Sequence, residues 1–155
     1  MNILIFSDSH SSVTPMLEIY ERTDCDAIIH LGDYVRDAKE LLRRTSGVPV
    51  YHVAGNCDFN IGAHTLQILE LEGVKIMITH GHMYQVKSGL GLLLDAAKSH
   101  GVKAVFFGHT HRQLLKESKN ILMLNPGAVS DCDNSYAFVK IENNEINATL
   151  LRGKI

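Results

Sequence analysis

Residues 1–10 read Met-Asn-Ile-Leu-Ile-Phe-Ser-Asp-Ser-His. The apolar run over residues 3–6 is typical of a buried strand, and it ends abruptly in Asp8-x-His10. A carboxylate and an imidazole therefore stand just beyond the carboxyl end of a strand, which is where open α/β sheets bind their ligands. A single Asp-x-His is common in loops. It gains weight in this chain because four later segments have the same layout.

Each of the later segments follows an apolar, β-branched or aromatic run. They are Gly32-Asp33, Gly55-Asn56-Cys57-Asp58, Thr79-His80-Gly81-His82 and Gly108-His109-Thr110-His111. Five strand ends could therefore converge on one point. Strands and helices alternate over residues 1–54, which predicts parallel strands with right-handed crossovers. We expect one α/β domain over residues 1–155, with two packed mixed sheets and helices on the outer faces.

The first half of the chain contains recognisable helix signals. Thr14-Pro15 has the form of an N-cap followed by proline at the first helical position. Residues 37–40, Asp-Ala-Lys-Glu, have the form of a capping box. The helix that follows should carry Leu41 and Leu42 inward before Gly47 ends it.

The second half is expected to contain more strands. Glu72-Gly73 should turn the strand over residues 65–71 into a second strand, 74–79, that delivers His80. Leu90, Leu93, Leu94 and Ala97 follow the i, i+3, i+4, i+7 rule of a helix. Further strands are expected at residues 103–107, around Leu114, at 121–124, at 136–141, and after the Asn143-Asn144 turn.

The composition is that of an ordinary globular protein, with 45% hydrophobic and 21% charged residues. A formal net charge of −2 gives no general attraction to nucleic acid or anionic membranes, so phosphate recognition would have to be local. No stretch approaches the length needed to cross a membrane. Cys25, Cys57 and Cys132 lack paired spacing, which indicates reduced thiols. We expect a cytoplasmic protein, with a homodimer as the guess for its assembly.

The polar groups at the five strand ends suit two divalent metal ions. The expected ligands are Asp8, His10, Asp33, Asn56, His80, His109 and His111. Two ions held roughly 3.5–4 Å apart repel each other, so a carboxylate and a hydroxide should bridge them. Asp33 is the natural bridge because it stands isolated after a glycine. Asp8 and Asp33 could instead cap helices, but no convincing helix start follows Asp33.

Asn56 is informative because an amide oxygen binds a metal without adding charge. Two divalent ions then outweigh Asp8, Asp33 and a bridging hydroxide by one positive charge, and the site attracts an anion. Imidazole and carboxylate ligands without a thiolate shell suit Mn²⁺ first, with Ni²⁺, Zn²⁺ or Fe²⁺ as alternatives, better than Ca²⁺.

The order of these motifs resembles that of the calcineurin-like metallophosphoesterases, and most closely their small single-domain bacterial and archaeal phosphodiesterases. Asn125-Pro126-Gly127 also resembles a loop of this branch. The resemblance implies a four-layer α/β/β/α sandwich and assigns the same seven ligands. It implies a phosphodiesterase in which a hydroxide bridging two metal ions attacks a phosphodiester, and a nucleotide is one candidate substrate. A scaffold subunit of the eukaryotic retromer coat resembles the same proteins, so a protein-binding scaffold stays an alternative, as does a phosphomonoesterase.

The expected catalytic residues beside the metals are Asn56, Cys57, Asp58 and His82. Many members of the family carry histidine where this chain has Cys57, and a thiol with an unperturbed pKa near ~8.5 is a poorer acid. We therefore expect a preference for diesters with good leaving groups, or else slow turnover on generic substrates. Cys57 could also attack phosphorus itself or be inert. Asp58 should orient the Asn56-Cys57 turn, and His82 could support a ligand, contact phosphate or merely pack.

Overall fold

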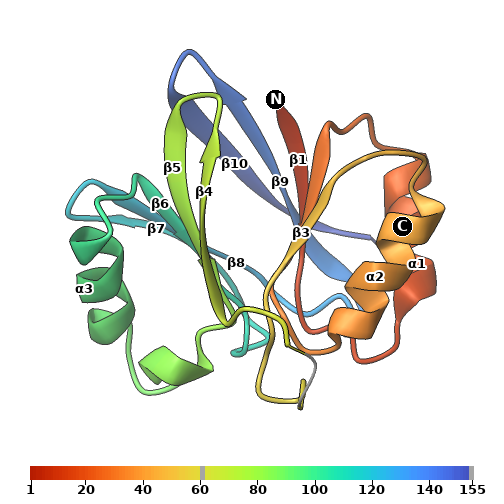
Figure 1. Ribbon diagram of the computed structural model, residues 1–155, viewed down its shortest axis with the longest axis horizontal. Helices are drawn as coiled ribbons and strands as arrows, with labels where there is room; N and C mark the ends of the chain where they lie inside the picture. Colours follow the sequence, from red (N-terminus) through yellow and green to blue (C-terminus); the bar gives the residue numbers. More distant parts are fainter. Residues whose placement is uncertain (60–61, 154–155) are drawn as a thin grey trace.

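Two mixed β-sheets of five strands each form the centre of the computed structural model over the residues it describes, 1–59 and 62–153 (Figure 1). The first sheet has the order β10-β9-β1-β2-β3, with β1 parallel to β2 and antiparallel to β9. Its strands are β1 (Asn2–Phe6), β2 (Ala27–His30), β3 (Val50–His52), β9 (Ser135–Glu142) and β10 (Glu145–Arg152).

The second sheet has the order β4-β5-β6-β8-β7. Its strands are β4 (Leu66–Leu71), β5 (Val74–Thr79), β6 (Ala104–Phe106), β7 (Gln113–Ser118) and β8 (Ile121–Pro126). The predicted hairpin turns at Glu72-Gly73, where both residues have a positive φ, as a type I′ turn requires. The three central strands, β5, β6 and β8, are parallel to one another, so β5 and β6 end at the same edge.

The run at residues 3–6 is apolar throughout because β1 is covered on both faces. Ile3 and Ile5 point into the core between the two sheets, whereas Leu4 and Phe6 point toward the helices, and all four side chains are fully buried. Phe106 on β6 closes the same central core from the second sheet. The sequence of β1 thus contributes to two hydrophobic layers at once.

Three helices cover the outer faces of the sheets over the described residues. α1 (Val13–Glu21) and α2 (Val35–Arg44) lie on the first sheet, and α3 (Gly91–Ser99) lies on the second (Figure 1). Leu93 of α3 packs against Met77 and Val105 of the second sheet. A short 3₁₀ turn, η1 (His82–Tyr84), follows β5. The predicted four-layer α/β/β/α order is therefore confirmed. No helix among the described residues is long and apolar enough to cross a membrane.

Both helix starts predicted from capping signals were wrong. α1 begins at Val13 after Ser12, so Thr14-Pro15 lies inside its first turn. α2 begins at Val35, which puts Asp37 inside the first turn rather than at a cap. The reason in both cases is that no local side chain caps the helix. The N-terminus of α2 is instead bound by a carboxylate from a distant loop.

The inward side of α2 was predicted correctly for Leu41 and wrongly for Leu42. Leu41 is fully buried, whereas 51% of Leu42 is exposed. Successive helical residues are rotated by roughly 100°, so two adjacent leucines do not both face the sheet.

Strands β3 and β6 are also shorter than the predicted residues 48–54 and 103–107.

The Leu41–Leu42 pair offers a matched test of this packing. We expect Leu41→Ala to lower the free energy of unfolding by roughly 2–5 kcal/mol, because it leaves a cavity between α2 and the first sheet. Leu42→Ala removes the same atoms from an exposed site and should cost less than about 1 kcal/mol. Urea unfolding followed by circular dichroism measures both values. Equal losses for the two variants would contradict the assigned orientation of α2.

Candidate metal centre

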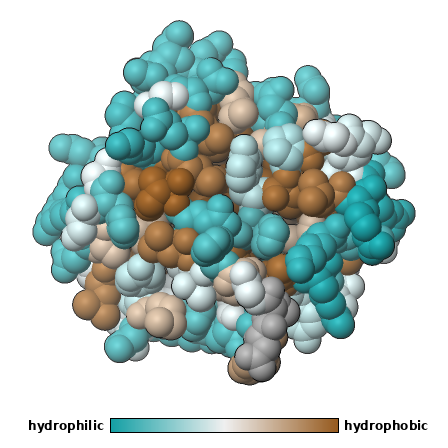
Figure 2. Space-filling model, in the orientation of Figure 1, coloured by the Kyte–Doolittle hydropathy of each residue, from teal (hydrophilic) through white to brown (hydrophobic). Residues whose placement is uncertain are grey.

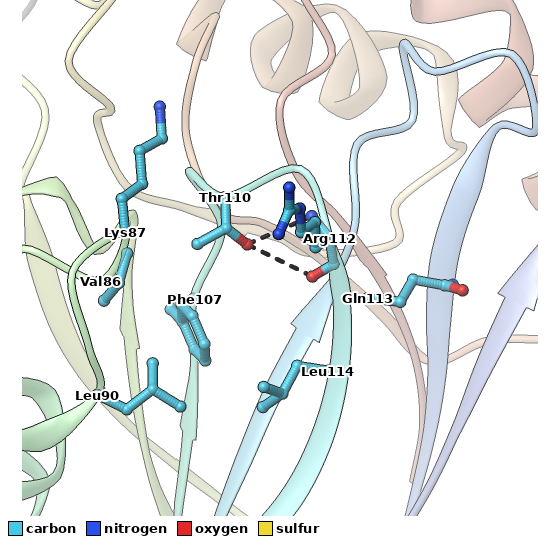
Figure 3. A pocket seen from close by; sticks show the side chains of 8 residues that line it. All are labelled: Val86, Lys87, Leu90, Phe107, Thr110, Arg112, Gln113 and Leu114. Carbon is cyan, nitrogen blue, oxygen red and sulfur yellow. Dashed lines mark hydrogen bonds between the residues drawn. The ribbon is translucent and has the colours of Figure 1, made fainter.

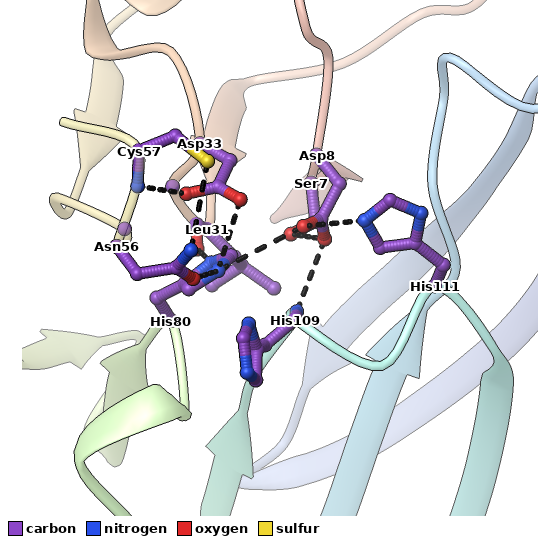
Figure 4. A network of polar contacts seen from close by, with 12 residues as sticks. Ser7, Asp8, Leu31, Asp33, Asn56, Cys57, His80, His109 and His111 are labelled. Carbon is purple, nitrogen blue, oxygen red and sulfur yellow. Dashed lines mark hydrogen bonds and ion pairs between the residues drawn. The ribbon is translucent and has the colours of Figure 1, made fainter. Parts of the chain in front are cut away.

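The ends of five strands meet at one edge of the two sheets. Asp8 follows β1, Asp33 follows β2, Asn56 follows β3, His80 follows β5 and His109 follows β6. Backbone hydrogen bonds link these ends within each sheet: the N–H of Asp8 donates to the carbonyl of Gly32, and the N–H of Gly108 donates to that of His80. Figure 4 shows the resulting cluster, with Asn56 and His111 at its opposite ends.

The imidazole of His80 lies at the centre of the cluster and is fully buried. Its Nδ1 is 2.8 Å from the carbonyl oxygen of Leu31, which accepts the ring proton there. The other ring nitrogen, Nε2, faces three oxygens: Asn56 Oδ1 at 3.2 Å, Asp33 Oδ2 at 3.4 Å and Asp8 Oδ1 at 3.8 Å. Four atoms with lone pairs thus point into one space, which calls for a proton or a metal cation.

The two carboxylates each have one oxygen satisfied by the protein and one left facing the cluster. Asp8 Oδ2 accepts hydrogen bonds from Ser7 Oγ at 2.5 Å and from the N–H of His109 at 3.1 Å. Asp8 Oδ1 is buried, lies 3.2 Å from His111 Nε2, and makes no hydrogen bond of acceptable geometry. Asp33 Oδ1 accepts from the N–H of Cys57 at 2.9 Å.

The free atoms fall into small sets that could hold a metal ion. Asp8, His10 and His111 offer donor atoms within 4.8 Å of one another, and so do Asp8, Asp33 and His80. His10 Nε2 is buried without a hydrogen-bond partner and lies 3.8 Å from Asp33 Oδ2. Orphaned oxygen and imidazole donors that share one space fit a divalent transition-metal ion.

The backbone around these side chains is strained in a consistent way. Five of the seven expected ligands have a positive φ: Asp8 (53°), His10 (43°), Asp33 (54°), His109 (67°) and His111 (58°). This region is uncommon for residues other than glycine and costs on the order of 1–3 kcal/mol per residue. Other non-glycine residues with a positive φ, such as Glu72 and Asn143, lie in hairpin turns, whereas these five lie at the strand ends that carry the expected ligands.

Two glycines allow the loops to approach one another closely. A Cβ on Gly55 would collide with the Asp33 carboxylate, and a Cβ on Gly108 would collide with the hydroxyl of Ser7. Both glycines immediately precede an expected ligand, Asn56 or His109. Their missing side chains therefore let two loops reach the carboxylates.

The electrostatics of the cluster divide its histidines into two kinds. Burial acts to lower the pKa of His80, but Asp33 and Asp8 outweigh it and raise that pKa. Burial acts to raise the pKa of Asp33, but the hydrogen bond and charge of His80 lower it overall. Burial, aided by the charge on His80, lowers the pKa of His109 to about 4, so this imidazole is neutral near pH 7. A metal ion would therefore compete with a proton for His80 and find His109 already unprotonated.

A buried polar chain supports the loop of Asp8 and His10, and sequence reasoning missed it. His30, the last residue of β2, is fully buried, and its Nε2 lies 2.9 Å from Ser9 Oγ. That hydroxyl donates to Asp37 Oδ2 at 2.7 Å, and the N–H of Ser11 donates to the same oxygen at 2.8 Å. Asp37 therefore holds the Asp8-x-His10 loop. The sequence feature that could have indicated this chain is Ser9, whose hydroxyl stands between the two expected ligands Asp8 and His10.

Two further side chains hold the other loops. Asp58 accepts hydrogen bonds from the N–H groups of Gly55 at 2.9 Å and Val35 at 2.8 Å, so it fixes its own turn and caps α2. This agrees with the orienting role expected of Asp58. Asn125 Nδ2 donates to the carbonyl of Gly108 at 2.8 Å and to Thr110 Oγ1 at 3.1 Å, which fixes the loop of His109 and His111.

Cys57 and His82 lie at the edge of the cluster. Burial and the nearby Asp33 carboxylate raise the pKa of the Cys57 thiol to about 11, so it stays protonated near pH 7. A thiol in this state is a poor nucleophile and a weak acid. The ring of His82 is 5.5 Å from that of His80 between centroids, and its Nδ1 is buried without a partner.

Three cavities lie at the cluster or beside its loops. One of about 430 Å³ is lined by Asn56, Asp58 and His82, among others. A second, of about 410 Å³, is lined by His111 and Asp131, among others. The third, of about 540 Å³, is lined by Thr110, which stands between His109 and His111 in the chain, and by residues that include Lys87 and Arg112 (Figure 3). The cluster is therefore open to molecules larger than a single inorganic ion.

A sandwich of two mixed sheets with carboxylates and imidazoles gathered at the strand ends defines a metallophosphoesterase-type fold. The chain belongs to the calcineurin-like phosphoesterase superfamily, whose domain model matches residues 1–144. The family resemblance inferred from the motifs is therefore confirmed.

Relatives from bacteria and archaea support this assignment. The chain is 33% identical over 150 residues to the probable metallophosphoesterase YsnB of Bacillus subtilis, covering 92% of this chain and 86% of that protein. It is 29% identical over 147 residues to the phosphodiesterase MJ0936 of Methanocaldococcus jannaschii, covering 82% and 83% of the two chains.

Solved structures agree with the fold. A predicted phosphoesterase from Streptococcus pneumoniae superposes with a TM-score of 0.80 at 28% identity, covering 98% of this chain and 89% of that one. A single mutant of Vps29 from Entamoeba histolytica superposes with a TM-score of 0.78 at 18% identity, covering 98% and 99% of the two chains. At this identity the likeness to Vps29 concerns the fold alone.

The buried His30 gives a prediction about pH. Burial lowers the pKa of His30 to about 4, below its ordinary value of 6.5. Between these values the unfolded chain binds the proton and the folded chain does not, so stability is full above pH 6.5 and falls as the pH drops toward 4. We expect His30 to contribute a loss of about 1.4 kcal/mol per pH unit in this window.

The test is urea unfolding of wild type and His30→Gln, without metal, at several pH values between about 7 and 5. The comparison concerns the slope of stability against pH, because other groups titrate equally in both proteins. The variant should lose the slope contributed by His30. Parallel slopes would show that His30 is not held neutral by burial.

Proposed function

We propose that this protein is a metal-dependent phosphodiesterase with a dinuclear centre. The observation that carries the proposal is the convergence of Asp8 Oδ1, Asp33 Oδ2 and His80 Nε2, buried donor atoms that lie within 4.8 Å of one another. The family and the relatives named phosphodiesterase support a phosphoesterase. Mn²⁺ is the proposed metal. A cytoplasmic location and a homodimer stay predictions.

Seven side chains are proposed to hold the two ions. They are Asp8, His10, Asp33, Asn56, His80, His109 and His111. Asp33 is proposed as the bridge because its Oδ2 faces His80 on one side and His10 on the other, at 3.4 and 3.8 Å. When bound, two divalent ions supply Lewis acidity that activates water and offsets charge on a phosphate.

The surrounding residues prepare these ligands. Leu31, through its carbonyl, holds the proton on His80 Nδ1 and so leaves Nε2 free to bind. Asp58 fixes the turn that presents Asn56 and Cys57. His82, with its unpartnered buried Nδ1 beside Asn56, is proposed to contact the phosphate.

A diester fits the surroundings of the cluster better than a monoester. A phosphodiester carries two organic substituents, and cavities lie both on the Asn56 side and on the side of Thr110 and His111. A monoester would use space on only one side. Cavities on both sides therefore favour a substrate with organic groups on both sides of the phosphorus.

The scaffold alternative finds no specific support in the surface. The exposed large apolar side chains belong to different elements, such as Leu42 on α2, Ile68 on β4 and Leu92 on α3. On the face drawn in Figure 2, apolar residues reach the surface in separate patches divided by hydrophilic ones. The structures of Vps29 fit this alternative but do not favour it.

Hydrolysis of two nitrophenyl esters tests the proposal. With Mn²⁺, the wild-type protein should hydrolyse bis(4-nitrophenyl) phosphate with a higher kcat/KM than 4-nitrophenyl phosphate. Asp33→Asn should lower the diesterase rate by roughly 100-fold or more, since even groups that only support a metal ligand cost ~10–100-fold. Asp24→Asn makes the same chemical change on the surface and serves as the control. A metal-loaded protein without turnover would favour the scaffold, and a preference for the monoester would favour a phosphomonoesterase.

Cys57 generates a second prediction about leaving groups. An imidazole can donate a proton near pH 7, whereas the Cys57 thiol, with its pKa raised to about 11, is a poor donor. We expect Cys57→His to raise kcat for an alkyl diester by roughly tenfold or more and to change the nitrophenyl diester little. Cys57→Ser controls for loss of the thiol. An unchanged or lower rate with the alkyl diester would contradict this role.

A further inference from the structure

The cavity of about 540 Å³ is lined in part by the loop that carries two of the proposed metal ligands. Thr110 lines this cavity and stands between His109 and His111 in the chain. Lys87 also lines it, from the segment between η1 and α3. A substituent on a phosphate bound at the cluster could therefore enter this cavity.

The floor of the cavity is apolar. Phe107 is 1% exposed and Val86 is 5% exposed, and the half-buried Leu90 and Leu114 complete the floor. Figure 3 shows Leu90, Phe107 and Leu114 gathered at one end of the cavity. An apolar space of this size, within the roughly 300–1,000 Å³ of ordinary ligand sites, suits a flat ring better than a polar sugar alone.

Two cationic side chains lie toward the other end of the cavity. The ammonium group of Lys87 and the guanidinium group of Arg112 lie away from Leu90 and Leu114 in Figure 3. Neither forms an ion pair with an acidic side chain among residues 1–59 and 62–153. Because the whole chain has a net charge of −2, these two charges form a local exception that favours an anion.

We propose that this cavity, the Thr110 cavity, binds a nucleotide-like substituent of the substrate: a nucleobase on the Phe107 floor and a second phosphate between Lys87 and Arg112. This inference rests on the proposed function, because it places the scissile phosphate at the metal cluster. It narrows the substrate to phosphodiesters that carry one additional anionic phosphate. Lysine and arginine are the side chains that bind phosphate oxygens by charge-assisted hydrogen bonds.

A matched pair of substrates tests the second phosphate. The dinucleotide pApA carries a 5′-phosphate that ApA lacks, and the two are otherwise identical. We expect the Mn²⁺-loaded wild type to hydrolyse pApA with a kcat/KM roughly tenfold above that for ApA. In the double variant Lys87→Ala/Arg112→Ala this ratio should fall to about one. The double variant Lys39→Ala/Arg44→Ala removes the same charges from exposed positions on α2 and should keep the wild-type ratio.

A binding measurement separates this inference from the proposed activity. Calorimetric titration of the metal-free protein with 5′-AMP and with adenosine needs no turnover. We expect 5′-AMP to bind more tightly than adenosine to the wild type and to Lys39→Ala/Arg44→Ala, but not to Lys87→Ala/Arg112→Ala. Equal binding of the two ligands to the wild type would overturn the Thr110 cavity as a phosphate site, and so would equal losses in both double variants. Absence of all diester hydrolysis would overturn the proposed function, and the titration would still decide on the cavity.

Discussion

The rest of the structure depends on two carboxylates, Asp8 and Asp33, that are buried close to the same histidine. Asp8 is fully buried and Asp33 is 3% exposed, so neither is solvated well enough to carry its charge without help. In the protein alone, two histidines supply that help. Asp33 and Asp8 raise the pKa of His80 against the effect of burial, and Asp8 raises the pKa of His111. Metal ions bound at the cluster would take over this role from the ring protons.

The fold supplies this arrangement through its two parallel strand sets. β1 and β2 bring Asp8 and Asp33 to one edge of the first sheet, while β5 and β6 bring His80 and His109 to the facing edge of the second. Gly55 and Gly108 allow the loops to meet, and Asn125, Asp58 and Asp37 hold the loops in place by hydrogen bonds. The residues with a positive φ in these turns lower the stability of the fold locally. The burial of both faces of the sheets offsets this strain.

Much of this arrangement could be predicted from the sequence because its signals are local. Each ligand candidate follows a short apolar run, and a strand end is readable from residues such as Ile5, Phe6 and Asp8 alone. The start of α2 could not be predicted, because Asp58 caps it from more than twenty residues away. The same holds for Asp37, whose pattern mimics a capping box while its carboxylate binds Ser9 across the fold. The Thr110 cavity is lined by Lys87 and Arg112, which come from separate loops. No local sequence pattern shows that these two residues line the same cavity.

The central claim is that these side chains grip a pair of metal ions, and anomalous diffraction from crystals grown with Mn²⁺ tests it most directly. Data collected on both sides of the manganese absorption edge locate each ion independently of any assumption about activity. The account predicts two peaks roughly 3.5–4 Å apart, with the Asp33 carboxylate between them. A single peak on the surface, or none near Asp8 and His80, would contradict it.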